Sequence, residues 1–379
     1  MCRQRNGAIE DIFNMSKLLF IQYRPFGAVM NGGDQGTKKN LDAARRVLGE
    51  ANVDVFYIHS KAGKSSLIEY LKGVIYMPFG YFFGLTPAKV KQIVSAAQGY
   101  DYIFIERSLF GVIAKALKAA GYDGKIITSF QNIEVLYFDA KLHKRLPFRN
   151  IVIRCADKND RWSCVYSDMI VVLNDRDNNE IQKRYDRTAE MQTPVTLEDK
   201  CASFEIDKKV LTRTRPLCLF LGSYFLANNE GILWFMQNVY PHVDVEVKIV
   251  GRGMAKLKAE QPELLRDIEV ISDAPSLAPY FEEADVMVLP IFAGSGMKVK
   301  TCESLMYGKN IIATDEALEG YAIEEGKSAW RCNTAEEFAT CINDFAAHPR
   351  PRWNENARQC YLDNYSETAI EKIFKELLN

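Results

Sequence analysis

The sequence has no long apolar run and no pattern of paired cysteines. A membrane-spanning helix needs about 18 consecutive apolar residues, and no run in the sequence is that long. Residues 1–14 are polar and charged, without the apolar segment of a signal peptide. The nine cysteines stand singly, with no CxxC pair and no CxxC…H spacing. This pattern predicts reduced thiols in a cytoplasmic compartment and argues against a zinc site.

An excess of charge of one sign is also lacking. The chain carries 48 Lys and Arg against 49 Asp and Glu, a formal net charge of -1, so nucleic acid is not an expected partner. Hydrophobic content of 47% and charged content of 26% are typical of a soluble globular protein. The 379 residues are enough for two domains that each have their own core.

Residues 1–14 are expected to be a disordered extension, because Met15-Ser16-Lys17 before the apolar stretch LLFIQY looks like a natural start. Short apolar runs then alternate with helical patterns, one of them from Thr37 to Leu48. The predicted strands are Leu18–Tyr23, Val53–Ile58, Tyr102–Ile105, Lys125–Phe130 and Met169–Leu173. This alternation predicts an α/β domain with a parallel sheet over residues 15–200.

Polar residues follow the strands of this first domain, where open parallel sheets bind ligands. A glycine-rich loop also precedes the helix from Thr37; it is either a binding loop or an ordinary turn into that helix. The acceptor-side candidates at the strand ends are therefore Glu106, Arg107, Gln131, Asn132 and Glu134; for Gly32 and Gly33 of the loop, a place on the acceptor side is implied only by the family resemblance described below. The run Ala62–Ser66 is not a P-loop, because Ile58 stands where the motif needs its first glycine.

Two further stretches of this domain each allow two interpretations. Residues 67–85 are rich in aromatic and aliphatic side chains, and Lys141–Arg161 is a basic helical stretch. The first is explained by core packing and the second by a solvated face. The alternative is a surface that contacts a lipid, or a lipid-linked acceptor with an anionic head.

The chain becomes charged and loop-like between Thr193 and Arg213, where we place the domain boundary. A second alternating pattern follows over residues 213–350 and predicts another parallel sheet. Its strands are Leu217–Leu221, Val245–Val250, Ile268–Ile271, Asp285–Leu289 and Asn310–Ala313. The loop Asn228–Gly231 is expected to open a helix that ends at Val239.

The stretch Asp285–Gly320 is a β-loop-α-β pattern whose helix runs from Met297 to Tyr307. A glycine-rich turn at a helix N-terminus exposes backbone N–H groups that suit a phosphate. Glu303 lies at the edge of the apolar stripe of this helix. It either pairs with Lys300 at the surface, or it accepts ribose hydroxyls while Lys298 or Lys300 faces a diphosphate.

The segment VLPIFAGSGMKVKTCESLMYGKNII resembles the donor-site segment of GT-B glycosyltransferases, closest to glycosyltransferase family 4 of the bacterial cell-surface polysaccharide type. The resemblance implies two Rossmann-like domains facing a cleft, the second one binding a nucleotide sugar, and a final helix over residues 351–379 that crosses back. It implies Lys300, Glu303 and Lys298 as catalytic residues. It implies donor contacts by Gly222, Ser223, Gly251, Arg252, Gly294, Ser295, Gly296, Met297 and Thr301.

The chain departs from the family's pattern in three places. Ser295 stands where the family usually has the first of two glutamates, of which Glu303 matches the second. Gln131 replaces a histidine and cannot act as a base. Ser223 and Glu230 stand where an arginine and a lysine usually neutralise the donor diphosphate. That charge is then expected from Lys298, Lys300 or Arg252.

The expected function is transfer of a sugar from a nucleotide-sugar donor to a glycan or lipid-linked acceptor in cell-surface polysaccharide synthesis. The resemblance implies retention of configuration, and no Asp-x-Asp motif stands in a suitable loop, so neither a metal nor another cofactor is expected. The expected location is cytoplasmic, with peripheral contact to the inner face of the cytoplasmic membrane as an extension. Alternatives are a sugar-nucleotide 2-epimerase of the same fold and a non-catalytic nucleotide-sugar or glycan-binding relative.

Overall fold

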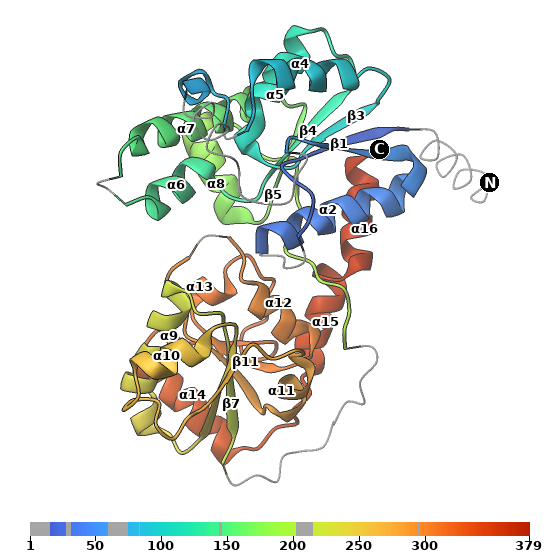
Figure 1. Cartoon of the computed structure of the whole chain (residues 1–379). Helices are drawn as coiled ribbons and strands as arrows, with labels where there is room; N and C mark the ends of the chain where they lie inside the picture. The colour runs from blue at the N-terminus through green and yellow to red at the C-terminus, as the bar shows by residue number, and fades with distance from the viewer. Residues whose placement is uncertain are drawn as a thin grey trace, which may run out of the picture. The chain divides into compact units, whose positions relative to one another are not determined.

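The computed structural model describes residues 16–27, 32–59, 75–82, 84–143, 146–201, 215–294 and 296–379. The expected extension over residues 1–14, the run 62–66, the first part of 67–85 and Ser295 lie outside these ranges. The chain forms two compact units. Unit 1 comprises the described residues up to Pro194 together with Ile370–Asn379, and unit 2 comprises those of Val195–Ala369. Each unit has a parallel sheet between helices, as the sequence predicts (Figure 1).

The sheet of unit 1 has six parallel strands in the order β2-β1-β3-β4-β5-β6. Strand β1 is central enough to pair with both β2 and β3, and all of its side chains are buried, as in a sheet covered on both faces. The strands are β1 (Leu18–Gln22), β2 (Val53–Tyr57), β3 (Tyr102–Ile105), β4 (Lys125–Phe130), β5 (Met169–Val172) and β6 (Met191–Gln192).

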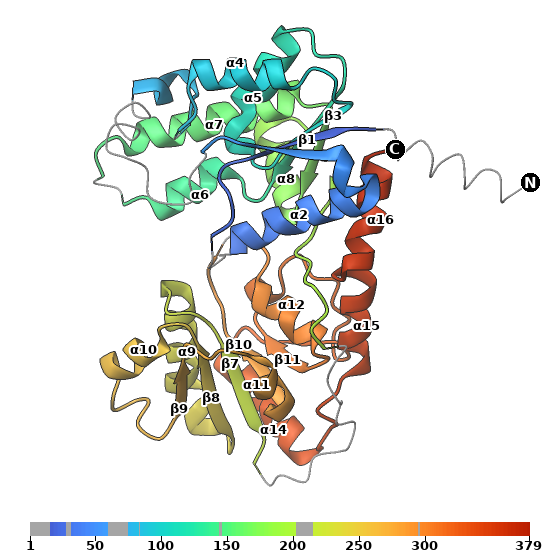
Figure 2. The same ribbon diagram turned by 45° about the vertical axis from the view of Figure 1, so that its right-hand side comes forward.

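Alternate side chains of β1 enter two different cores, because successive residues of a strand point to opposite faces. Leu19 and Ile21 pack with residues of α4, α5 and α7, whereas Leu18 and Phe20 pack with α2 and α16, which Figure 2 shows on one face. The helices are α2 (Gly32–Leu48), α4 (Pro87–Ala96), α5 (Gly111–Ala119), α6 (Glu134–Lys141), α7 (Arg149–Tyr166) and α8 (Asp175–Tyr185). The 3-10 turns are η1 (Glu50–Asn52), η2 (Met77–Phe79) and η3 (Ser108–Phe110).

The sheet of unit 2 also has six parallel strands, in the order β12-β11-β10-β7-β8-β9. Strands β7 and β10 lie side by side in its middle, so the segments that follow them emerge at the same edge. The strands are β7 (Leu217–Leu221), β8 (Glu246–Gly251), β9 (Glu269–Ser272), β10 (Val286–Leu289), β11 (Asn310–Ala313) and β12 (Trp330–Arg331).

The helices of unit 2 are α9 (Leu226–Asn238), α10 (Met254–Glu260), α11 (Ala278–Glu283), α12 (Val299–Met306), α13 (Asp315–Leu318), α14 (Ala335–Ala347) and α15 (Glu355–Asn364), with η4 (Tyr240–His242). The last helix, α16 (Glu367–Leu377), begins in unit 2 and buries Ile370 and Phe374 in the core of unit 1. The C-terminal helix therefore returns to the first domain as expected. The returning part is shorter than residues 351–379, because α15 belongs to unit 2.

Several helix predictions were wrong at their boundaries. Helix α2 begins at Gly32 and not at Thr37, so the expected glycine loop is its N-terminal part. Helix α9 likewise begins at Leu226, ahead of the expected loop Asn228–Gly231. Helix α8 was not predicted, although the Asn174 side chain caps it by accepting from Asp177 N. Tertiary packing outweighs the weak helix propensity of glycine, asparagine and aspartate in these helices, and in α8 the Asn174 cap adds to it.

The basic stretch Lys141–Arg161 is not one helix. It is divided between the end of α6 and the start of α7, with Phe148 in the left-handed conformation at φ 66 between them. One face of α7 is deeply buried and holds Asn159 and Asp160. The stretch is thus partly core and partly surface; neither interpretation expected the buried face, and the lipid-contacting surface stays a prediction.

Candidate functional site

Helix α12 of unit 2 carries the strongest candidates for donor binding. It follows β10 after a glycine-containing segment and ends at Met306, and Gly308 just beyond it has a φ of 55, the left-handed conformation that closes a helix. Thr301 is fully buried, and its hydroxyl donates to Ala317 O at 2.7 Å. The Thr301 hydroxyl therefore holds α13 against α12, and the donor contact expected at this position stays a prediction.

The ammonium of Lys300 lies inward of the helix surface. Nζ donates to Oδ1 of Asn228 at 2.6 Å and lies over the Phe220 ring, 4.9 Å from its centre. Burial lowers the pKa of Lys300 to about 7; the charge of Glu303 opposes this shift and that of Lys298 adds to it. Lys300 can therefore gain or lose its proton near neutrality, and a bound diphosphate would favour the charged form.

Glu303 carries a half-buried carboxylate that makes no hydrogen bond or ion pair with any residue the structure describes. The surface pair with Lys300 that the sequence allowed does not form. Burial raises the pKa of Glu303 to about 7, and the positive charges of Lys200 and Lys300 oppose that shift. A carboxylate held in this way is free to accept hydroxyl groups from a ligand.

Lys298 is arranged differently from Lys300. Its ammonium pairs with Glu316 at 2.6 Å and donates to Gly296 O at 2.8 Å. Gly294 lies against it, since a Cβ there would be 3.1 Å from Lys298 Cε. Lys298 therefore ties the glycine segment to α13, while Met297 is buried beneath it.

The turns after β7 and β8 reach the same place through Asn228. Its Nδ2 donates to Ser223 O at 2.8 Å while its Oδ1 accepts from Lys300. Gly222 and Gly251 touch through their backbones, because a Cβ on Gly251 would lie 1.9 Å from Gly222 O. The structure thus brings Gly222, Ser223, Gly251 and Lys300 together. Arg252 is exposed beside them.

The sequence analysis missed Asn228, although it named the loop that contains it. The available signal was an asparagine just after the Gly222-Ser223 turn, at the carboxyl end of a central strand. Nothing in the local pattern pairs it with Lys300, since the two are 72 positions apart. The Glu230 that replaces the family's lysine is exposed on α9.

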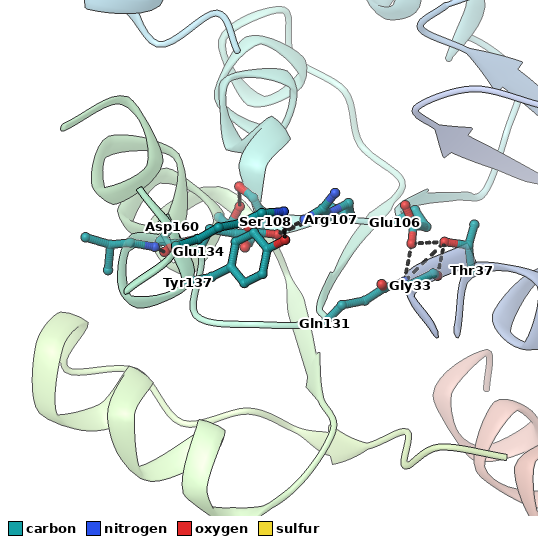
Figure 3. Close-up of polar contacts among 12 residues, drawn as sticks. Gly33, Thr37, Glu106, Arg107, Ser108, Gln131, Glu134, Tyr137 and Asp160 are labelled. Carbon is teal, nitrogen blue, oxygen red and sulfur yellow. Dashed lines mark hydrogen bonds and ion pairs between the residues drawn. The ribbon is translucent and has the colours of Figure 1, made fainter. Parts of the chain in front are cut away.

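Unit 1 holds a separate cluster of polar groups at the carboxyl ends of β3 and β4 (Figure 3). The Glu106 carboxylate accepts from Thr37 Oγ1 and from Gln131 Nε2, both at Oε1. The Thr37 hydroxyl also lies 3.0 Å from Gly33 O, so its one proton is shared between these two acceptors. Burial raises the pKa of Glu106 to about 8, against the charge of Arg107 and the bond from Thr37. Glu106 is therefore a neutral acid at pH 7, joined to α2 and β4.

Arg107 points away from Glu106 and pairs with Glu134 (Figure 3). Its Nε and Nη2 donate to Glu134 Oε1 at 3.0 and 2.7 Å. Burial raises the pKa of Glu134 and raises that of Asp160 far more, because Asp160 also lies close to the Glu134 charge. Arg107 and Glu134 are thus a partly buried ion pair, next to the buried carboxyl of Asp160, whose pKa is raised by burial and by the Glu134 charge.

The remaining acceptor-side candidates lie near these groups. Asn132 is half-buried and without a hydrogen bond to a described residue, and Gly33 is exposed at the start of α2, one residue after Gly32. Thr37 and Asp160 were not foreseen, because one was assigned only to a helix and the other to a basic charge run. Within the described ranges, no group of three or more His, Cys, Asp or Glu side chains is placed to hold a metal ion.

Residues 215–348 match the family model of glycosyl transferases group 1. No curated protein matches the sequence. The lipopolysaccharide outer core galactosyltransferase WaaB is similar in fold, with 14% identity and a TM-score of 0.67 over 96% of this chain and 99% of the other. HepE of Anabaena, solved with UDP, has 12% identity and a TM-score of 0.63 over 96% and 99%.

A third similar structure is the α,α-trehalose 6-phosphate synthase of Burkholderia multivorans, with 12% identity and a TM-score of 0.63 over 96% of each chain. These likenesses and the two doubly wound units define the GT-B fold, as the sequence predicts. The chain therefore has the GT-B architecture. Its unit 2 contains the domain of the glycosyl transferases group 1.

Proposed function

We propose that the protein transfers a hexose-like sugar from a nucleotide sugar to a glycan or lipid-linked acceptor. The observation that carries the donor half is that one short helix holds both Lys300, whose pKa lies near 7, and Glu303, whose carboxylate bonds to no described residue. A diphosphate supplies the charge that Lys300 needs, and a ribose supplies hydroxyl donors for Glu303. The sequence match of residues 215–348 supports the same assignment.

The acceptor half of the proposal rests on unit 1. Glu106, Gln131 and Asn132 place a neutral carboxyl and two amides at the carboxyl ends of β3 and β4. Such groups both donate and accept hydrogen bonds, which suits sugar hydroxyls. WaaB is described as a lipopolysaccharide outer core enzyme, and by analogy we extend the proposal to a lipid-linked glycan in cell-surface polysaccharide synthesis.

For the reaction itself we propose retention of configuration without a metal ion. The bond from the sugar carbon to the acceptor oxygen forms while its bond to the diphosphate breaks, and the departing phosphate takes the acceptor's proton. Lys300 and the backbone N–H groups at the start of α12 stabilise the leaving charge. Gln131 cannot serve as a base in such a step.

We further propose a cytoplasmic protein that touches the inner membrane surface through unit 1. Arg154, Lys158 and Arg161 share one face of α7, at spacings of about one helical turn, and Phe79 beside them is 67% exposed. Lys158 Nζ binds Pro78 O at 3.0 Å, which joins this face to η2. Phe82 is 5% exposed and belongs to the core, so it is not a lipid contact. No described helix is long and apolar enough to span a membrane.

The donor proposal is tested by thermal-shift screening of the whole chain against UDP-, GDP-, dTDP- and CMP-sugars, first without metal and then with magnesium. The expected result is a metal-independent rise in melting temperature with one nucleotide sugar, followed by sugar transfer to a lipid-linked glycan. An epimerase would instead return the nucleotide sugar with its C2 inverted in the absence of any acceptor. Binding without turnover would identify a non-catalytic relative.

The membrane proposal is tested separately by co-sedimentation with vesicles. The chain is expected to pellet with anionic but not with zwitterionic vesicles, and Phe79→Ser and Lys158→Ala are expected to reduce the bound fraction. The exposed Lys375 of α16 gives a charge-matched control, Lys375→Ala. Equal partition into both kinds of vesicle would contradict the proposal.

A further inference from the structure

The segment Val195–Cys201, which we name the strap, lies along α12 within unit 2. At its first residue, the Val195 N–H points at Met297 Sδ at 3.5 Å, and Val195 O accepts from Cys302 Sγ at 3.8 Å. Met297 and Cys302 stand just before and within the first turns of α12. The strap therefore begins beside the N-terminal half of the proposed donor helix.

The other end of the strap is fixed to the C-terminal end of the same helix. Arg358 of α15 binds both carboxylate oxygens of Asp199, the Nη1–Oδ1 distance being 2.9 Å, and its Nη1 also donates to Met306 O at 2.7 Å. Asp199 Oδ1 accepts in addition from Cys201 N at 3.0 Å. The backbone on both sides of Lys200 is thus held by a charge-assisted, nearly buried clamp.

Glu303 lies between these two attachments. It follows Cys302 directly and precedes Met306 by three positions, so it shares the helix face to which Arg358 and Asp199 are bound. Lys200 is exposed and makes no hydrogen bond or ion pair with a described residue. Of the positive charges that act on Glu303, that of Lys200 is the strongest. The attachments of the strap beside Cys302 and Met306 place Lys200 next to the part of α12 that carries Glu303, and no direct bond joins these two side chains in the described structure.

We propose that Lys200 is a donor-binding residue that acts together with Glu303 on the ribose hydroxyls of the nucleotide. This inference rests on the proposed function. A hydroxyl group both donates and accepts, so one placed between the two side chains donates to Glu303 and accepts from the ammonium of Lys200. Asp199 and Arg358 are positioning residues, because they fix the backbone that carries Lys200 and the end of the helix that carries Glu303.

The test is a double-mutant cycle on the full chain, with nucleotide affinity measured by calorimetry against UDP, GDP, dTDP and CMP. For the nucleotide that binds the parent, Lys200→Ala is expected to raise Kd about tenfold, the equivalent of one lost charged hydrogen bond. In the Glu303→Gln background the same change is expected to have less than about a twofold effect, because its coupling partner is gone. Lys200→Arg is expected to restore most of the affinity.

Controls separate this inference from the proposed function. Lys375→Ala removes an exposed lysine of unit 1 and is expected to leave Kd unchanged. Asp199→Asn and Arg358→Lys are expected to raise Kd and to reduce the coupling between Lys200 and Glu303, a readout that a general loss of stability would not change. Parent-like affinity of Lys200→Ala, or an equal loss in both backgrounds, overturns the inference alone. A parent chain that binds none of the four nucleotides overturns the proposed function as well.

Discussion

The ammonium of Lys300 and the side-chain oxygen of Asn228 lie 2.6 Å apart, which joins α12 to the start of α9. The same asparagine holds Ser223 O at 2.8 Å. One amide therefore ties the turn after β7 to the only titratable cation that we assign to the donor phosphate. Because Lys300 is buried and its pKa lies near 7, this contact helps to decide whether the cation exists at neutral pH.

Replacing Asn228 by alanine is expected to weaken nucleotide binding without unfolding the chain. Lys300 then loses its hydrogen-bond acceptor, which disfavours its charged form, and we expect Kd to rise roughly three- to tenfold, or about 0.7–1.4 kcal/mol. Calorimetric titration measures the change. Asn238→Ala at the other end of α9 is the matched control, since its amide only donates to Trp234 O. Equal affinities of the two variants would contradict the role of Asn228.

Nucleotide affinity is expected to have a maximum near pH 7. The carboxylate of Glu303 must be ionised, so affinity falls as pH drops through its pKa of about 7. The ammonium of Lys300 must be charged, so affinity also falls as pH rises through its pKa of about 7. Glu303→Gln should remove the acid limb and Lys300→Met the alkaline limb. Titrations from pH 5.5 to 8.5, a range of about 1.5 units on each side of neutrality, measure both. Unchanged profiles would exclude these residues from the site.

Glu106→Gln is expected to change how the stability of the chain depends on pH. The pKa of Glu106 rises from 4.5 to about 8 on folding, so the folded state holds a proton that the unfolded state releases between these values. This contribution is complete below about pH 4.5 and is lost as pH rises to about 8. From pH 5 to pH 8, the free energy of unfolding of the variant should therefore rise relative to that of the parent by on the order of 3–4 kcal/mol.

Urea unfolding at several pH values measures that difference. Glu376→Gln on the exposed side of α16 serves as the control, because it removes a carboxylate that makes no hydrogen bond with a described residue. If the free energy of unfolding depends on pH in the same way in Glu106→Gln as in the parent, the Glu106 carboxyl is not neutral in the folded state. A free energy of unfolding that falls more steeply with rising pH in the variant than in the parent would also contradict a neutral Glu106.

Gly111→Ala is expected to destabilise unit 1 strongly. A Cβ at Gly111 would lie 2.1 Å from Asn159 O and 2.8 Å from Ser163 N, both backbone atoms of α7 that cannot move independently. We expect a loss of about 2–3 kcal/mol, typical of overpacking at a helix contact. Gly36→Ala is the control: its Cβ would meet Gln131 at 3.4 Å, and the gain in helix propensity is about 1 kcal/mol. Denaturant unfolding compares the two, and similar stabilities would contradict the close packing.

The strands could be predicted from the sequence with little error. Leu217–Leu221, Lys125–Phe130 and Asn310–Ala313 have the same ends in the structure, because a strand buried on both faces is a short continuous apolar run. The helix starts were harder. The glycines of α2 and the asparagines of α9 disfavour helix locally, and contacts such as that of Thr37 with Glu106 come from distant parts of the chain.

The candidate site, like the fold, could be predicted only in part from the sequence. The sequence by itself determined which strand ends carry polar groups, and it determined the glycine segment and the helix that bears Lys300 and Glu303, because these depend on local order along the chain. Only the tertiary structure decided that Thr301 is core and that Lys298 is tied to Glu316. It also decided that Asn228 and Lys300 share a hydrogen bond and that the Glu303 carboxylate makes none with the described residues. Burial and pairing depend on which residues meet in space, and no local pattern records those contacts.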